Sequence, residues 1–328
     1  MSQVNSRQAK ETAMSRLTLN RRNAMLRTTS RFVSVLFVLS LAAFCAATAQ
    51  ADSAAWIGTI DANWANLGNW DGTPVAVPGT GNTATFNGAA GAGGAVIDLG
   101  AGVTINTILF DTANAAAYTI GSGAVGSQTL ILDDSGAVTM NATVASNELF
   151  NANILLGTAT AGTYTFTNNS ATNALTFAGG VQGGAGGTGD AKTLTVTGAG
   201  NTGIGGIIAN GGASALALTK DGAGTLTLTG VNSFTGQLSV QSGTLSIATA
   251  NSVSVAGPLG NSALSVILGG SGQTGTLQYT GATVTSTKPF TMAAGGAGVF
   301  QVDSGATNLT ISGLISGSGA MSKTGAGT

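Results

Sequence analysis

Histidine is absent from this 328-residue chain, and cysteine occurs only once. Charged residues make up 7% of the sequence, aromatic residues 5%, and there are four prolines. Without histidine there is no imidazole for a metal site, a general base or a Ser-His-Asp triad. Low charge combined with 43% hydrophobic residues excludes an ordinary disordered chain, which is charge-rich and poor in apolar residues. The 52 glycines follow no three-residue period, which excludes collagen.

What charge there is lies mainly at the N-terminus. Seven of the eleven basic residues fall in the first 31 positions, followed by an apolar run at 32–47 and an A-Q-A sequence at 49–51. This order predicts a secretory signal peptide over 1–51, cleaved after residue 51. A retained anchor is the alternative, although the apolar run is shorter than the roughly 20 residues of a membrane span. The basic segment is long, so translation from Met1 or from Met25 stays open.

Removal of the predicted signal peptide changes the charge balance of the chain. Four lysines, no arginine and eleven acidic residues remain, which gives a net charge of −7. An acidic chain of this kind is not expected to bind nucleic acid, because phosphate backbones are held by clustered Lys and Arg. The cysteine is also removed, so no disulfide framework supports the exported protein.

Short segments that alternate apolar residues with Thr or Ser fill the chain from residue 96 onward. Examples are the Y-T-F, L-T-V and L-T-L sequences at 164–166, 194–196 and 226–228. A period of two predicts strands with one buried face, and the glycines between them suit tight turns. Strands this short and this regular predict an all-β, right-handed parallel β-helix with coils of about 22 residues. We expect a Trp-bearing N-terminal cap at 52–95 and the β-helical region at 96–328.

One segment has a more specific pattern. Residues 218–247 read LTKDGAGTLTLTGVNSFTGQLSVQSGTLSI, and the opening of this segment returns as MSKTGAGT at 321–328. The unit consists of a strand, a K-x-G-x-G turn, a second strand, an N-x-F-x-G turn and two further strands. Lys220 and Lys323 are expected to cap an exposed strand edge, where Lys discourages unwanted pairing.

This unit closely resembles the autotransporter-associated β-strand repeat, also called the passenger-associated transport repeat. The resemblance implies a β-helical passenger that is secreted or held at the surface of a Gram-negative cell, associated with the outer membrane. It implies as partners the outer-membrane translocation machinery or the protein's own C-terminal β-barrel, with the repeat assisting transport or folding. Residue 328 falls within a truncated second repeat that begins at 321, so we interpret the chain as an N-terminal fragment of unknown extent.

The three tryptophans lie together with acidic residues near the predicted cleavage site. Trp56, Trp64, Trp70 and Asp71 are candidates for glycan contact, because flat indole rings can stack on sugar rings. The alternative is structural, since the first coil of a solenoid has an open end that needs a bulky cover. The sequence favours the structural interpretation.

Other motifs carry weaker signals. G-x-G-x-x-G occurs repeatedly, but no predicted helix follows to receive a pyrophosphate. The G-G-T-G-D sequence at 186–190 resembles a single copy of a calcium-binding nonapeptide, and the acids at 133–134 are expected to end a strand in a turn. We therefore predict no catalytic residues, no cofactor and no metal. The predicted function is a non-enzymatic structural passenger or stalk; the alternative is an adhesin that binds an extracellular glycan or a host or neighbouring surface.

Overall fold

The structure is a computed structural model that describes residues 53–72, 74–157, 161–184, 190–212 and 214–328. The predicted signal peptide at 1–51 and all but the last residue of the 186–190 calcium motif lie outside the described residues. Both stay predictions. The proposed boundary between 52–95 and 96–328 is also a prediction that the fold does not test.

Within the described residues every regular element is a strand, as predicted, except one short 3-10 helix, η1 (Leu67–Asn69). One sheet has fourteen strands: β1 (Ala54–Ala55), β2 (Thr83–Phe86), β4 (Val103–Phe110), β6 (Thr129–Met140), β8 (Asn153–Leu156), β9 (Gly162–Asn168), β11 (Val181–Gln182), β12 (Lys192–Thr197), β14 (Ile208–Ala209), β15 (Leu216–Lys220), β17 (Leu238–Val240), β19 (Val266–Leu268), β22 (Phe290–Met292) and β25 (Ile315–Gly317). The second sheet has ten: β3 (Val96–Ile97), β5 (Thr119–Ile120), β7 (Glu148–Phe150), β10 (Leu175–Phe177), β13 (Thr202–Ile204), β16 (Thr225–Leu228), β18 (Gly243–Ile247), β20 (Thr274–Tyr279), β23 (Ala297–Val302) and β26 (Ala320–Thr324). A small third sheet pairs β21 (Val284–Ser286) with β24 (Leu309–Ile311).

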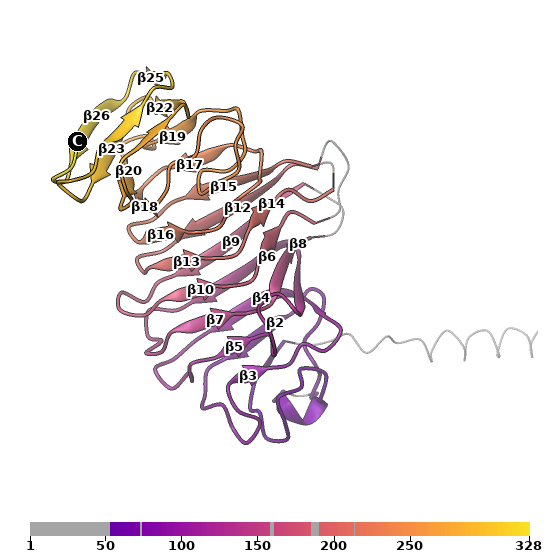
Figure 1. The fold of residues 1–328 in the computed structure, drawn as a ribbon. Helices are drawn as coiled ribbons and strands as arrows, with labels where there is room; N and C mark the ends of the chain where they lie inside the picture. Colours follow the sequence, from indigo (N-terminus) through magenta and orange to yellow (C-terminus); the bar gives the residue numbers. More distant parts are fainter. Residues whose placement is uncertain (1–52, 73, 158–160, 185–189, 213) are drawn as a thin grey trace, which may run out of the picture. The chain divides into compact units, whose positions relative to one another are not determined.

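Each described strand pairs in parallel with the strand one coil before it or after it, and the coils stack in chain order (Figure 1). This arrangement is the predicted parallel β-helix; its right-handed sense stays a prediction. The coils are less uniform than predicted. In-register partners are 20 residues apart between Thr219 and Ser239 but 30 apart between Thr107 and Ala137, because loops of different length leave the corners.

The fourteen-stranded sheet divides at β6. The first part of β6, around Leu130, pairs with β8, whereas its last part, around Val138, pairs with β9. The same division shows in the preceding strand, where the register shifts between Ile105 and Thr107. The sheet therefore contributes two faces of the solenoid, and the ten-stranded sheet contributes another.

The core follows from the two-residue period of the strands. In β12 and β15 every second side chain is buried, so Leu194 and Leu218 stack in register while Thr195 and Thr219 face outward. Burial of a leucine side chain stabilises a fold by roughly 1.5–3 kcal/mol, and the interior repeats this contribution coil after coil. The outer file of threonines suits a strand because a β-branched side chain packs well on a pleated surface.

Candidate functional site

The segment with the transport-repeat pattern forms two successive coils that pair with each other. Its strands β15 and β17 lie side by side in the fourteen-stranded sheet, with Leu218 opposite Leu238. Its strands β16 and β18 lie side by side in the ten-stranded sheet, with Leu226 opposite Leu245. One copy of the pattern therefore contains both halves of its own coil-to-coil interface.

Lys220, at the end of β15, turns into the protein. Its side chain is only 2% exposed. The ammonium Nζ donates hydrogen bonds to the carbonyl oxygens of Asp221 (2.6 Å), Gly222 (2.7 Å) and Ser242 (3.3 Å). An ammonium has three donors, so three acceptors satisfy it. Burial lowers the pKa of Lys220 to about 8, against the opposing effect of the nearby Asp221 carboxylate.

The expectation that Lys220 caps an exposed strand edge is therefore wrong. A lysine is normally driven outward because burial of an unpaired charge is costly. Here the glycine-rich turn presents carbonyl oxygens toward the interior. They accept hydrogen bonds from the ammonium and so compensate the cost of burying its charge.

Ser242 and Gly243, in the next coil, fit closely around the lysine turn. The Ser242 hydroxyl donates to Oδ1 of Asp221 at 2.7 Å, and this bond is the largest cause of the lowered pKa of Asp221. Gly243 has φ +68°, and a Cβ there would lie 2.3 Å from the Gly222 oxygen and 2.8 Å from Lys220 Nζ. Only glycine lets the backbone of this coil approach the ammonium so closely.

The N-x-F-x-G turn makes a second connection between coils. Asn232 is fully buried; its Oδ1 accepts from the Ile208 amide (2.9 Å) in the coil before, and its Nδ2 donates to the Pro258 carbonyl (3.3 Å) in the coil after. Phe234 is also fully buried, and its carbonyl accepts from the Asn261 amide at 2.8 Å. The residues that define the pattern thus act across three successive coils.

The second copy of the motif lies elsewhere in the fold. Lys323 is in β26, in the ten-stranded sheet, and is exposed. Its Nζ also bonds to carbonyls of its own turn, those of Gly325 and Gly327. The local sequence is therefore sufficient to fold the ammonium over the turn, whereas burial and the third acceptor of Lys220 come from the following coil.

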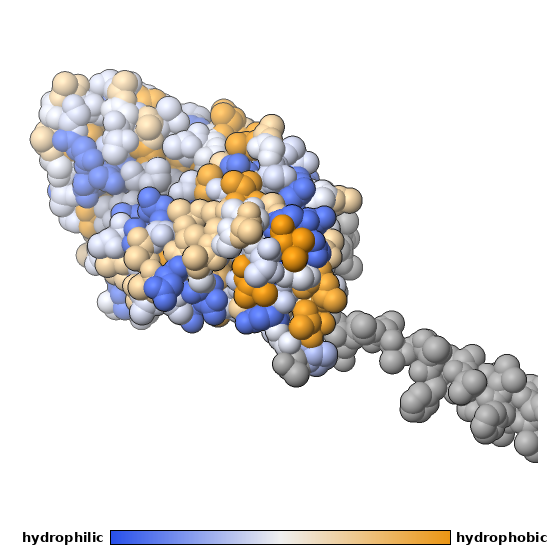
Figure 2. All heavy atoms as spheres, turned by 90° about the horizontal axis from the view of Figure 1, so that it is seen from below, coloured by the Kyte–Doolittle hydropathy of each residue, from blue (hydrophilic) through white to orange (hydrophobic). Residues whose placement is uncertain are grey.

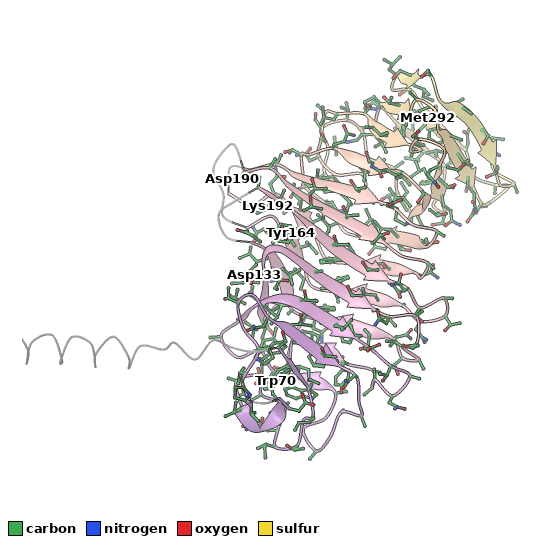
Figure 3. The ribbon with its side chains drawn as sticks, turned by 180° about the vertical axis from the view of Figure 1, so that it is seen from behind. Trp70, Asp133, Tyr164, Asp190, Lys192 and Met292 are labelled. Carbon is green, nitrogen blue, oxygen red and sulfur yellow. The ribbon has the colours of Figure 1, made fainter. Side chains whose placement is uncertain are left out.

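The three tryptophans occupy the first coils of the solenoid and are buried: Trp56 is 1% exposed, Trp64 3% and Trp70 1% (Figure 3 labels Trp70). Their rings pack edge to face, with centroids 5.0 Å apart for Trp56–Trp70 and 4.7 Å for Trp64–Trp70, and all three contact Phe86. Two of the indole N–H groups donate to main-chain oxygens, those of Pro78 and Trp64.

These contacts fit a cover for the end of the core. A sugar could stack on these rings only if the tryptophans first left the core and became exposed. Glycan contact by these residues stays a prediction, and their burial weighs against it.

Asp71, the fourth candidate for glycan contact, is exposed beside this cluster, and its Oδ1 accepts from the Ala55 amide at 2.8 Å. The buried Asn69, which was not predicted from sequence, organises the same segment by donating to Asp61 and accepting from the Ile60 amide. The polar groups near the tryptophans thus hold the first turn together. Figure 2, which views the solenoid from this end, shows apolar and polar residues intermixed on the surface. Ile60 and Leu67 of this segment are exposed.

The acids at 133–134 do not end a strand. β6 continues through them to Met140, so the predicted end of the strand is wrong. The pairing of β6 is nevertheless interrupted between Leu132 and Ala137, and Ser135 has a φ of +65°. Asp133 accepts from the Gly81 amide and from Asn106 Nδ2, while Asp134 accepts from the hydroxyl of Tyr164 at 3.1 Å. Both acids therefore lie where the sheet divides and accept hydrogen bonds from neighbouring coils there. Figure 3 labels Asp133 and Tyr164.

Several other buried ionisable groups, among them Glu148, Lys192 and Lys288, were not predicted from sequence. Glu148 is fully buried; its Oε2 accepts from the Tyr118 amide at 2.9 Å, and burial raises its pKa to about 8. Lys288 is also fully buried; its Nζ donates to the Ser262 carbonyl at 2.6 Å, and burial lowers its pKa to about 8. Glu148 and Lys288 each occupy a position that faces inward in the two-residue alternation of their segment. This alternation is the sequence signal that could have identified them.

A hollow of about 460 Å³ borders the repeat segment, between the turn at 229–231 and the loops at 248–251, 256–258 and 282–284. Its lining carries no charged side chain. Within the described ranges no group of three or more acidic or cysteine side chains is placed to hold a metal ion. The described part of the chain also has no helix long and apolar enough to cross a bilayer.

Comparison with known proteins agrees with this geometry. Residues 218–247 match the family described as Passenger-associated-transport-repeat. A stretch of 125 residues, 36% of this chain, is 36% identical to the adhesin BmaC autotransporter of Brucella suis biovar 1 (strain 1330), of which it covers 4%. No solved structure matches the chain. The autotransporter passenger repeat predicted from sequence is therefore confirmed.

Proposed function

We propose that this chain, which carries a passenger-associated transport repeat, is an exported β-helical passenger of autotransporter type that is secreted or displayed at the surface of a Gram-negative cell. The observation that carries the proposal is the repeat at 218–247, which is built into the solenoid as two of its coils. Similarity to an autotransporter over 125 residues supports the same function. Its partners would include outer-membrane translocation machinery.

We assign the passenger a structural role without catalysis. The sequence has no histidine, and three of the four lysines outside the predicted signal peptide are buried. Of these, Lys220 and Lys288 bond to main-chain oxygens, which removes them as nucleophiles or bases in the folded chain. The acids near the surface, such as Asp61, Asp98 and Asp133, are engaged by amide groups of the protein.

Surface exposure can be tested by protease shaving. Intact cells that produce the protein are treated with proteinase K, and the chain is detected with an antibody raised against 96–328. We expect its loss from intact cells while a periplasmic protein in the same cells survives. Survival of the chain until the outer membrane is permeabilised would contradict the proposal.

Adhesion is the second candidate, favoured by similarity to the Brucella protein, which is named as an adhesin. The described surface is poor in the aromatic side chains that usually bind sugars, because the large exposed apolar residues are aliphatic or Met. Purified 52–328 applied to a glycan array and to host-cell monolayers tests this candidate. Binding that survives Asp71→Ala but requires other surface residues would support adhesion and remove the glycan site predicted from sequence. If the protein binds neither the glycan array nor the host cells, adhesion is contradicted and the structural role alone is retained.

A further inference from the structure

We propose that Lys220 is a clamp that makes the two coils of the repeat fold and open as one unit. The clamp consists of the Lys220 ammonium and the carbonyl oxygens of Asp221, Gly222 and Ser242. Two of these acceptors belong to the lysine's own turn, and the third belongs to the turn that leads into β18. The inference concerns the cooperativity of the fold and does not depend on where the protein is displayed.

The argument begins with the cost of burying the ammonium. A charge removed from water must be compensated by hydrogen bonds in the interior. When the coil at 238–247 is detached, the turn of Lys220 is open to solvent and water can satisfy the ammonium. When that coil is in place, water is displaced, and the Ser242 carbonyl becomes the third acceptor. Closure of the coil and completion of the clamp are therefore the same event.

The fit of the second coil is specific to this turn. Ser242 contributes twice, by its carbonyl to Lys220 and by its hydroxyl to Asp221. Gly243 has no side chain where a Cβ would collide with the Gly222 carbonyl and approach the ammonium. A shift of register by one residue would lose both polar contacts and create the collision. The clamp therefore fixes the register of β17 and β18 on β15 and β16.

The chain contains its own control for this interpretation. Lys323 sits in the same K-x-G-x-G sequence and contacts two carbonyls of its own turn, but it is exposed. It lies in β26, which β20 and β23 separate from β18 in the ten-stranded sheet. Substitution at Lys323 should therefore leave the coupling of 218–247 unchanged.

Hydrogen exchange on the purified chain tests the proposal. In Lys220→Met, which keeps the volume of the side chain but removes its donors, we expect exchange of the amides at 238–247 to become about tenfold faster or more, because buried acceptors lose their partner. Lys323→Met should leave these rates unchanged. Unchanged exchange at 238–247 in Lys220→Met, or equal acceleration in the two variants, would overturn the proposal.

A second measurement needs no substitution and remains decisive if Lys220→Met does not fold. The unmodified chain is labelled with an amine-acylating reagent over a series of denaturant concentrations below global unfolding. Lys323 should react at once, whereas Lys220 should react only as fast as the amides at 238–247 exchange. Reaction of Lys220 while those amides stay protected would show that the second coil does not close the clamp.

Discussion

The interior of the solenoid is filled in two different ways along its length. Between Trp56 and Phe177 an almost continuous series of aromatic rings runs through the coils, ending in stacked pairs such as Phe166–Phe177, whose centroids are 4.2 Å apart. From the repeat onward, rings are replaced at several positions by polar groups bonded to main-chain carbonyls and amides, such as Lys220, Asn232 and Lys288.

This difference separates two sources of stability. Aromatic packing supplies large apolar burial but accepts a range of geometries. Hydrogen bonds inside the core add less net free energy, yet they are costly when misplaced, so they discriminate sharply between registers. The N-terminal coils are thus held mainly by aromatic burial, with single buried polar groups such as Asn69, Glu148 and Asn168 among the rings. From the repeat onward, buried ammonium groups bonded to main-chain carbonyls also contribute.

The largest effect is expected at the aromatic end. Trp70→Ala should lower the free energy of unfolding by about 3–5 kcal/mol, because it removes a buried ring and leaves a cavity. Urea unfolding followed by circular dichroism measures the change. Leu67→Ala, three residues away at a half-exposed side chain, is the matched control and should cost less than about 0.5 kcal/mol. Equal losses would mean that the indole cluster is not part of the core.

The second prediction concerns pH. Burial raises the pKa of Glu148 from 4.5 to about 8, so the unfolded chain loses its proton first and the folded state is favoured most below pH 4.5. Its contribution, on the order of a few kcal/mol, should be lost as pH rises from 4.5 to about 8. Glu148→Gln should remove this slope from a plot of unfolding free energy against pH.

The repeat side should respond in the opposite sense. The pKa of both Lys220 and Lys288 is lowered from 10.5 to about 8, so the unfolded chain binds more protons between these pH values. Stability should therefore rise with pH from about 8 to 10.5. An unchanged acid-side slope in Glu148→Gln, or a flat alkaline side in the unmodified chain, would remove the contrast between the two regions.

A smaller effect is expected from Asn232→Ala. The substitution leaves the Ile208 amide and the Pro258 carbonyl without their partner and should cost about 1–3 kcal/mol. Asn169→Ala, at an exposed asparagine, is the control and should change stability by less than about 0.5 kcal/mol. The comparison uses the same unfolding assay, and similar midpoints for both variants would contradict the role of Asn232.

The smallest effect is expected from Ser242→Ala. It removes the hydroxyl that bonds to Asp221 but keeps the carbonyl that bonds to Lys220, so it should cost about 0.5–1.5 kcal/mol. Nuclear magnetic resonance titration should show the pKa of Asp221 rising toward its ordinary value, because its largest lowering contact is lost. A pKa of Asp221 that does not move would show that the hydroxyl is not its main partner.

The fold was predictable from sequence because the two-residue period and the turn residues are local signals that parallel coils amplify. The inward position of Lys220 was also predictable, because it follows Leu216 and Leu218 in the two-residue alternation that places every second side chain of β15 in the core. The expectation that lysine faces water overrode that signal. What the sequence could not indicate is the carbonyl-lined turn that compensates the charge, because its third acceptor comes from a residue in the next coil, 22 positions away.

The predicted strand end at 133–136 failed for a related reason. Two acids, a serine and a glycine are typical of a turn when considered alone. Here the neighbouring coils supply amides to Asp133, and the sheet divides around these residues without ending the strand. Properties that depend on the adjacent coil are invisible to a local pattern.

The close contact of glycines with the coil beneath has a consequence for how such a chain can change in length. A Cβ at Gly224 would lie only 2.0 Å from the carbonyl oxygen of Gly200, its counterpart one coil earlier. Inserting one residue within a strand would move such a glycine off its carbonyl, bring a side chain into the collision and exchange the inner and outer faces. Residues can be gained or lost freely at the corners, where coil lengths already differ. Elsewhere, lengthening by duplication of whole coils is the route that keeps every glycine above its carbonyl.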